Sequence, residues 1–327
     1  MRAGYFSVRG VPFRFGGHDV TDIDVWLYLR PSSLTRERIL VDAKDKGKPK
    51  ALERVLWVKG LQSITGVEGS IVATTDKRPA VRQFGEAHGV LVLDGTFLGR
   101  LPTVLPASAG GERLFEDELF QLLTEYDRLL GQWRVRLLEA KARLIEAMDF
   151  GGCNAWLTDT HYFANQTITS SRREAACRLT YLMISYFLIG LDYSIRRLVF
   201  EHLDERQRAV EDGFRYGRGG RADVERSVSI AAQLLDNYAP EAGGLAGQLR
   251  SRIAHDFRDI PADVLSEYFV RPEVSRELFG MARTFEAAAY AQTVVRPEQL
   301  EQHAQATLGV VLDFLRIERA QYYAALS

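Results

Sequence analysis

The chain has 327 residues, of which 26% are charged and 46% hydrophobic, and its formal net charge is -1. This composition is that of a globular protein, and the presence of only Cys153 and Cys177 excludes a disulfide framework or a cysteine-based metal cluster. The length favours two domains. Residues 1–110 contain 16 lysines and arginines against 11 aspartates and glutamates, a balance of +5, whereas the remainder has a balance of -6. The basic N-terminal part is compatible with a polyanionic ligand.

The sequence also bears on location. Its start, MRAGYFSVRG, lacks the uninterrupted apolar stretch of a secretory signal, and two free cysteines suit a reducing compartment, so we expect a cytoplasmic protein. The longest uncharged apolar run is LTYLMISYFLIGL, Leu179–Leu191. Because a membrane-spanning helix needs about 20 apolar residues, we expect this run to form a buried helix, with no membrane as partner.

The first hundred residues alternate between strand-like and helix-like patterns. Two strand-like runs lie within TDIDVWLYLRPSSLTRERILVDAKDK, residues 21–46, and a helix is predicted from KPKALERVLWVKGLQSI. A strand (GSIVATT), a helix closed by Gly89 (PAVRQFGEAHG) and a further strand (VLVLDG) follow. The order of hairpin, helix, strand, helix and strand predicts a mixed β-sheet flanked by helices over residues 1–96.

The rest of the chain has a different pattern. Residues 97–111 collect Gly, Pro and Ser, which predicts a linker. Residues 112–327 are helical in pattern almost throughout, beginning with an apolar stripe that includes Leu119, Leu122 and Leu123. The predicted fold class is therefore α/β plus all-α. We expect the helical domain to serve dimerisation, recognition or regulation, as a homodimer or with a partner protein.

The two opening runs carry charged residues where a half-buried sheet usually carries apolar ones. Successive side chains of a strand point to opposite faces, so Asp22 and Asp24 share a face, as do Asp42 and Lys44. If the two runs pair, the acids meet. Carboxylate oxygens suit Mg²⁺, and an ammonium group can orient water or stabilise negative charge during phosphodiester hydrolysis. The alternative is that the acids cap a turn or lie solvated on an edge strand.

Asp24, then Asp42-Ala43-Lys44 about one hairpin later, with ERVLWVKGL, GSIVATT and EAHGVLVLDG, resembles the PD-(D/E)XK nuclease superfamily. The resemblance covers residues 5–96, is closest to the Mrr-like and resolvase-like branches, and implies the restriction-endonuclease-like fold. It implies a nuclease that uses Mg²⁺ or Mn²⁺, with DNA as the preferred substrate and a role in genome defence or DNA processing. It assigns Asp24, Asp42 and the Ala43 carbonyl to the metal and Lys44 to catalysis.

Other features leave alternatives open. Asp22 and Gln62 are candidate accessory residues of the same site. A non-catalytic nucleic-acid-binding or scaffold protein with a degenerate nuclease fold is the main alternative function. LRSRIAHDF, with Arg250 and His255, is similar to the R-x4-6-H motif of HEPN domains. That resemblance implies a metal-independent RNase, in which the histidine acts as acid or base and the arginine stabilises phosphate charge.

A basic and aromatic segment follows the apolar run. FRYGRGGRADV interleaves Phe214 and Tyr216 with Arg215, Arg218 and Arg221. Such a composition can stack on bases and contact phosphates. We interpret these three arginines as candidate nucleic-acid contacts, the alternative being a solvated connection between helices.

Overall fold

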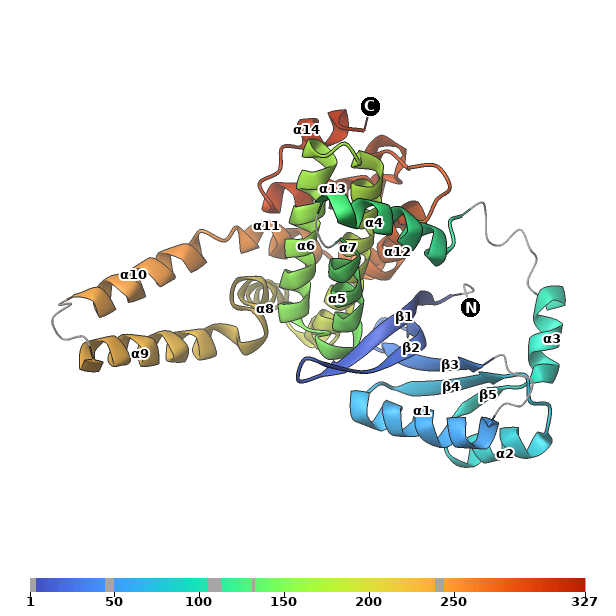
Figure 1. Ribbon diagram of the computed structural model, residues 1–327. Coiled ribbons are helices and arrows are strands. Elements are labelled where there is room, and N and C mark those ends of the chain that lie inside the picture. The colour runs from blue at the N-terminus through green and yellow to red at the C-terminus, as the bar shows by residue number, and fades with distance from the viewer. Residues whose placement is uncertain (1–3, 45–49, 105–112, 131–132, 239–243, 327) are drawn as a thin grey trace.

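The computed structural model describes residues 4–44, 50–104, 113–130, 133–238 and 244–326. A five-stranded sheet near the N-terminus packs against a mostly helical C-terminal part (Figure 1). The strands follow the order β1-β2-β3-β4-β5, in which β1, β2 and β3 are antiparallel neighbours and β3, β4 and β5 run parallel. The prediction of a mixed sheet followed by a helical region is confirmed.

The bounds of the elements are as follows. The strands are β1 (Phe6–Phe15), β2 (His18–Leu29), β3 (Glu37–Lys44), β4 (Gly69–Thr74) and β5 (Leu91–Leu93). The helices between and after the strands are α1 (Ala51–Thr65), α2 (Pro79–Ala87) and α3 (Gly95–Val104). The helices of the C-terminal part are α4 (Glu116–Leu130), α5 (Trp133–Glu146), α6 (Phe150–Thr169), α7 (Arg173–Ser194), α8 (Leu203–Tyr216), α9 (Gly220–Tyr238), α10 (Leu245–Arg258), α11 (Ala262–Phe269), α12 (Pro272–Ala289), α13 (Gln302–Phe314) and α14 (Arg319–Ala324). Short 3-10 turns are η2 (Ile195–Phe200), η3 (Gly217–Gly219) and η4 (Pro297–Gln299).

Strand β1 is absent from the predicted order of elements. The sequence predicts the hairpin between the runs that become β2 and β3, and this pairing is confirmed, but β2 also pairs with β1. Alternation along β1 is interrupted at Gly10, whose φ of +55° lies outside the strand region and suits only glycine well. Phe6 and Val8 are buried before this glycine and Val11 is buried after it, so the buried positions of β1 change parity at Gly10. That change of face hides the strand from a search for simple alternation.

The first half of the predicted linker over residues 97–111 is helical, because Gly95–Val104 form α3. Asp94 starts this helix: its carboxylate accepts hydrogen bonds from the Thr96 and Phe97 amides at 3.0 and 2.9 Å. Such capping satisfies the free N–H groups of a first turn. The remainder of the predicted linker, residues 105–111, lies outside the described residues.

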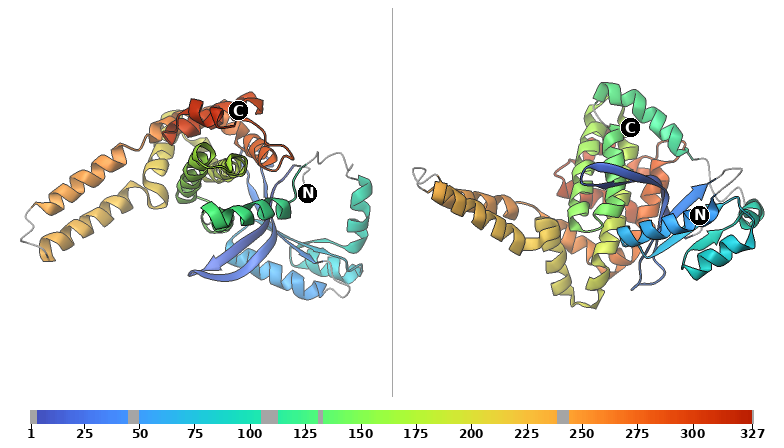
Figure 2. Two further views of the ribbon diagram at one scale, coloured as in Figure 1. Left: turned by 45° about the horizontal axis from the view of Figure 1, so that its top comes forward. Right: turned by 60° about the horizontal axis from the view of Figure 1, so that its bottom comes forward.

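The two faces of the sheet are covered differently (Figure 2). On one face, α1 packs on β3 and β4, while the helical part packs on β1 and β2 at the other end. On the opposite face, Leu98 of α3 packs on a smaller cluster that includes Leu27, Val41 and Ile71. The main hydrophobic core is continuous from α1 through the sheet into the helices, so the sheet and the helical part share one core.

Helix α7 forms the centre of the helical part. All its residues from Ala175 to Tyr193 are buried, which confirms the buried helix expected from the apolar run. It lies very close to α6: a Cβ built on Gly190 meets the Trp156 ring at 2.3 Å. Among the described residues, Arg173–Phe200 is also the one helical segment long and apolar enough to cross a membrane, and 94% of its apolar window is buried inside the protein.

A buried carboxylate on α7 fastens the sheet to the helices. Asp192 is fully buried and accepts hydrogen bonds from Tyr28 Oη at 2.6 Å and from Arg36 Nε and Nη2 at 2.5 and 2.9 Å. Arg30 Nη1 lies 3.1 Å from the same carboxylate. Burial, with the charge of Asp192 as a second cause, raises the pKa of Tyr28 well above its usual value. One carboxylate thus binds the end of β2 and the connection that leads to β3.

Replacing Asp192→Asn keeps the shape of the side chain but leaves Arg30 and Arg36 without their counterion. Removing one partner of a buried ion pair typically costs about 3–5 kcal/mol, and we expect a loss of that size in the free energy of unfolding, measured by urea denaturation. Asp19→Asn is the control, because Asp19 is 81% exposed in its pair with Arg14, and it should change stability by less than about 0.5 kcal/mol. A loss below about 1 kcal/mol for Asp192→Asn would show that the cluster does not fasten the two parts.

Candidate active site

The structure brings Asp24, Asp42 and Lys44 together at the ends of β2 and β3. The pairing of the two strands reaches Val25↔Val41, and the next step of this register sets Asp24 beside Asp42. Lys44 Nζ lies 3.2 Å from Asp24 Oδ2 and 3.9 Å from Asp42 Oδ1. Asp24 is 18 residues before Asp42 and 20 before Lys44. The three side chains meet because antiparallel pairing places them on one face of the sheet.

The three side chains differ in their exposure. The side chains of Asp24 and Lys44 are 31% and 33% exposed, whereas that of Asp42 is only 2% exposed. The Ala43 amide donates a hydrogen bond of 2.7 Å to Asp24 Oδ2, which fixes this carboxylate against β3. The outer half of the site is thus open to solvent, and Asp42 forms its floor.

Arg54, on the first turn of α1, completes the site and was not predicted from the sequence. Its Nε donates a hydrogen bond of 2.7 Å to Asp42 Oδ2, and its Nη2 contacts Asp42 Oδ1. This hydrogen bonding to Asp42 raises the pKa of Arg54. The guanidinium also stacks on Trp57, 4.2 Å from the ring centroid. We call Asp24, Asp42, Lys44 and Arg54 the charged cluster; its two carboxylates and two cations sum to zero.

A sequence signal for Arg54 exists in hindsight. A helix that follows a strand starts near the end of that strand, so a basic residue one turn into the helix can reach an acid at the strand end. Arg54 occupies this place, 12 residues after Asp42. The approach of the α1 start to the end of β3 is a tertiary feature, and the alternation pattern along β3 carries no information about it.

The donor set of the charged cluster fits one Mg²⁺ or Mn²⁺ ion on condition that Arg54 moves. Two carboxylates and a main-chain carbonyl are the oxygen ligands that Mg²⁺ takes while it keeps several waters. Both oxygens of Asp42 are bound to Arg54, however, and a cation must replace at least one of these contacts. Among the described residues, no group of three or more His, Cys, Asp or Glu side chains is placed to hold a metal ion.

Neither accessory residue lies in the charged cluster. Asp22 is exposed, two residues before Asp24, and forms no ion pair with any described residue. Gln62 lies near the far end of α1, where its amide donates to the Glu68 carbonyl at 3.1 Å and accepts from Ser70 at 2.8 Å. Helix α1 runs away from the carboxylates, so its start reaches them, and its end, with Gln62, does not.

The structure does not bring Arg250 and His255 together within the chain. Both are exposed on α10, and His255 Nε2 lies 3.4 Å from Asp259, one turn further along the same helix. Five residues of an α-helix correspond to about 140° of rotation beyond one full turn, so the two side chains point in different directions. Any joint action of this pair requires a second chain.

Arg250 instead lies in a groove with two of the arginines predicted to contact nucleic acid. The groove has a volume of about 770 Å³ and lies where α8, α9 and α10 meet. We define the basic groove by its arginines and aromatic rings: Arg215, Arg221, Arg250, Arg258, Tyr216 and Phe257. Arg215 and Arg250 are 35 residues apart in the sequence, and they line one groove because α9 and α10 pack antiparallel.

The basic groove has unsatisfied positive groups. Arg215 pairs with Glu211 at 2.8 Å, but its buried Nε has no hydrogen-bond partner among the described residues. Arg221 pairs with Asp212 at 3.0 Å. In the described part of the chain Arg250 forms no ion pair, and Glu225 is the acidic residue in the lining.

Aromatic rings form the wall of the basic groove. The Tyr216 and Phe257 rings lie 5.2 Å apart, and the Arg221 guanidinium lies 5.2 Å from the Tyr216 centroid. Arg218 is outside this groove: its side chain is 77% exposed and its Nε lies 3.3 Å from Asp149. The segment expected to be a loop is a tight joint in which α8 ends at Tyr216, η3 follows and α9 begins at Gly220.

If Asp42 is a metal ligand, Arg54 competes with the metal. Arg54→Gln should then raise the affinity for Mg²⁺ about fivefold, since a partly exposed ion pair is worth roughly 1 kcal/mol; isothermal titration calorimetry of the full chain measures it. Lys50→Gln is the control, because Lys50 is 75% exposed and pairs with Glu53 on the same helix. An unchanged or weaker affinity in Arg54→Gln would exclude Asp42 from the metal site.

Comparisons of the chain with protein families, with curated proteins and with solved structures find no match. The observations that bear on function are those of the charged cluster and the basic groove. The first combines carboxylates from two strands with a lysine and an arginine. The second combines arginines with two aromatic rings in contact, those of Tyr216 and Phe257.

Proposed function

We propose that the protein is a metal-dependent nuclease that hydrolyses phosphodiester bonds at the charged cluster, with DNA as the preferred substrate. The observation that supports it best is the meeting of Asp24, Asp42 and Lys44, with Lys44 Nζ 3.2 and 3.9 Å from the two carboxylates. The mixed sheet, with a helix after β3 and parallel strands β4 and β5, agrees with the restriction-endonuclease-like fold that this function implies. The preference for DNA rests on the resemblance described above.

In the proposed reaction the chain positions charge around one phosphate. Asp24, Asp42 and the Ala43 carbonyl would hold Mg²⁺ or Mn²⁺, which when bound would supply Lewis acidity and a water of lowered pKa. Lys44, part exposed and beside both acids, orients the attacking water and stabilises negative charge on the phosphate. Arg54, released from Asp42, remains close enough to attract a phosphate oxygen, because arginine binds phosphate in a bidentate manner. The Ala43 amide keeps Asp24 in place.

A second function is favoured by the same arginine. Arg54 satisfies both oxygens of the buried Asp42, so the charged cluster is stable as it stands without any metal. If the pair of Arg54 with Asp42 never opens, the protein would bind nucleic acid or act as a scaffold without catalysing a reaction. The two functions differ in whether a metal and a substrate together displace Arg54.

A cleavage assay of the purified chain tests the proposal. Plasmid, linear and single-stranded DNA, and RNA, are incubated with Mg²⁺, Mn²⁺ or EDTA. We expect metal-dependent cutting that falls at least about a hundredfold in Asp42→Asn and in Lys44→Ala, because each variant removes charge that stabilises the transition state. Glu53→Gln, an exposed acid on α1, is the matched control and should cut like the wild type.

Three other outcomes of the cleavage assay would contradict the proposal, and two of them would favour a different function. Equal cutting by the wild type and Asp42→Asn would disprove the assignment of the site. Tight, salt-sensitive DNA binding without cutting over all metals would favour the non-catalytic alternative. RNA cleavage that resists EDTA and disappears in His255→Ala would favour the HEPN-like mechanism.

The basic groove supports nucleic acid as the substrate. Figure 1 shows α9 and α10 side by side as an arm that extends away from the other helices, and the basic groove lies where this arm joins α8. Arginines beside aromatic rings suit a flexible single strand, in which phosphates contact the guanidinium groups and bases stack on aromatic faces. We infer that the arm holds a single-stranded part of the substrate while the charged cluster acts on the backbone.

Replacing Arg250 and Arg258 by Gln tests this role of the arm. Each phosphate contact of a single strand contributes about 0.7 to the dependence of log affinity on log salt. The double variant should therefore bind single-stranded DNA more weakly, with a slope reduced by about 1.4, in fluorescence anisotropy titrations. Arg252→Gln is the control, since Arg252 is 81% exposed on the same helix and outside the basic groove. An unchanged slope in the double variant would exclude the groove from binding.

A further inference from the structure

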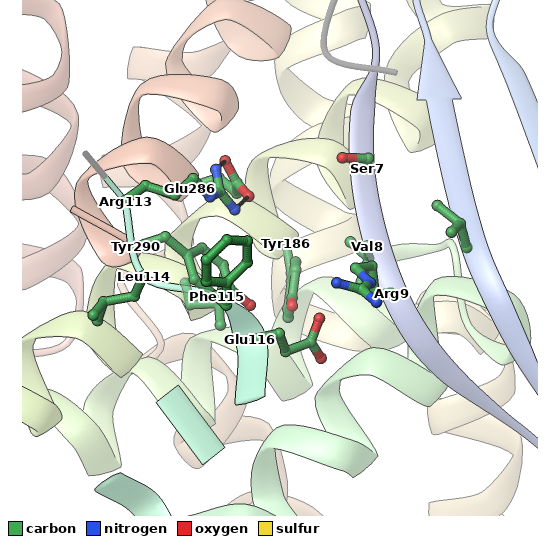
Figure 3. A pocket seen from close by; sticks show the side chains of 12 residues that line it. Ser7, Val8, Arg9, Arg113, Leu114, Phe115, Glu116, Tyr186, Glu286 and Tyr290 are labelled. Carbon is green, nitrogen blue, oxygen red and sulfur yellow. Dashed lines mark hydrogen bonds and ion pairs between the residues drawn. The ribbon is translucent and has the colours of Figure 1, made fainter. Parts of the chain in front are cut away.

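A cavity of about 340 Å³ lies between the edge strand β1 and the helices (Figure 3). We call it the β1 cavity and define it by its aromatic and charged lining: Arg9, Phe115, Glu116, Tyr186, Glu286 and Tyr290. Val25, also in the lining, directly follows Asp24 on β2, and successive side chains of a strand point to opposite faces. The cavity and the candidate active site thus lie back to back on one strand.

The β1 cavity contains two tyrosine hydroxyls that nothing in the described chain satisfies. Tyr186 and Tyr290 are 1% and 5% exposed, and neither hydroxyl forms a hydrogen bond with a described residue. Other buried tyrosines of this chain do form one: Tyr28 donates to Asp192 and Tyr181 donates to the Val295 carbonyl. Burial raises the pKa of both cavity tyrosines well above the usual value, so both hydroxyls keep their protons and can donate. Neither hydroxyl is among the enclosed unpaired atoms of the described residues, so both are open to the space of the cavity and can pair with a ligand that enters it.

Among the described residues around the β1 cavity, one cation has no ion-pair partner. Arg113 makes a bidentate pair with Glu286, at 3.0 and 2.6 Å, and the fully buried Lys141 pairs with Glu116. Arg9 is exposed and forms no ion pair with a described residue. In Figure 3, Arg9 extends from β1 toward the space that Tyr186 and Glu116 border. Since Glu116 is already neutralised by Lys141, the free guanidinium favours an anionic group at this end.

We propose that the β1 cavity binds a nucleotide, with its base among the rings of Phe115, Tyr186 and Tyr290 and its phosphate on Arg9. The base edge carries both donors and acceptors, which matches two hydroxyls that can each donate and accept. Its aromatic face stacks on the rings, and the phosphate forms a charge-assisted pair with arginine. Ligand pockets commonly span roughly 300–1,000 Å³, and this cavity is at the small end, which suits one nucleotide and excludes a duplex.

Two kinds of ligand carry both a base and a phosphate: a free mononucleotide and an unpaired nucleotide of a nucleic-acid strand. Binding at the β1 cavity does not depend on catalysis at the charged cluster. The test is therefore made in EDTA, in which the proposed nuclease activity is absent, so that failure of one proposal does not affect the other.

The experiment is isothermal titration calorimetry of the full chain with adenosine monophosphate, uridine monophosphate, adenosine, inorganic phosphate and a short single-stranded DNA. We expect both mononucleotides to bind and inorganic phosphate to bind at least about tenfold more weakly, because it lacks the base. Tyr186→Phe removes one hydroxyl and keeps the ring, and should weaken mononucleotide binding about fivefold. Arg9→Gln should weaken it at least about tenfold. Arg14→Gln, on the same strand and outside the cavity, is the control.

Folding is checked separately by thermal unfolding. Because the Tyr186 hydroxyl has no partner in the described protein, Tyr186→Phe should not lower the melting temperature, which distinguishes a ligand-binding hydroxyl from a structural one. Competition between the DNA strand and adenosine monophosphate would identify a strand nucleotide as the ligand, and binding of the mononucleotide alone would identify the free molecule. No mononucleotide binding at millimolar concentration, or binding that neither variant weakens, would overturn the proposal.

Discussion

The buried carboxylate of Asp192 is the constraint on which the arrangement of the sheet and the helices depends. A fully buried charge is stable only when it is paired and hydrogen-bonded, and Asp192 obtains its partners from the other part of the molecule, from Tyr28, Arg30 and Arg36. The end of β2 and the start of the connection to β3 are thereby held on α7. Since Asp24 lies on β2 and Asp42 on β3, the same contact limits how far these two strands can move against each other.

The alternation of residues was sufficient to predict the carboxylate pair. A strand has a period of two, so a register that places Val25 opposite Val41 in the core also places Asp24 beside Asp42. The helices and strands after β3 followed from turn residues and apolar spacing in the same way. Strand β1 did not, because Gly10 reverses its faces. Helix α3 did not, because Asp94 as a helix cap stands in a segment rich in Gly and Pro.

What the sequence did not predict are contacts between elements that are distant along the chain. Arg54 reaches Asp42 because α1 turns back onto β3, and no local pattern encodes that angle. Arg221 and Arg250 were predicted for different reasons, the first for nucleic-acid contact and the second for an RNase motif, and they share one groove because α9 and α10 pack antiparallel. His255 shows the opposite case: its spacing from Arg250 matched a motif, yet helix geometry directs it elsewhere.

The charge balance of the charged cluster connects metal and substrate binding. Two carboxylates already face two cations, so a divalent ion alone gains little and must displace Arg54 from a pair that both Asp42 oxygens stabilise. A phosphate changes this balance, because it is negatively charged like Asp42 and offers the Arg54 guanidinium a new bidentate partner. In the proposed nuclease, substrate and metal would therefore assist each other, because a phosphate that pairs with Arg54 would leave the Asp42 carboxylate to hold the metal. Under this proposal a buried, arginine-bound Asp42 is compatible with catalysis, because Arg54 would leave Asp42 only when a phosphate is present.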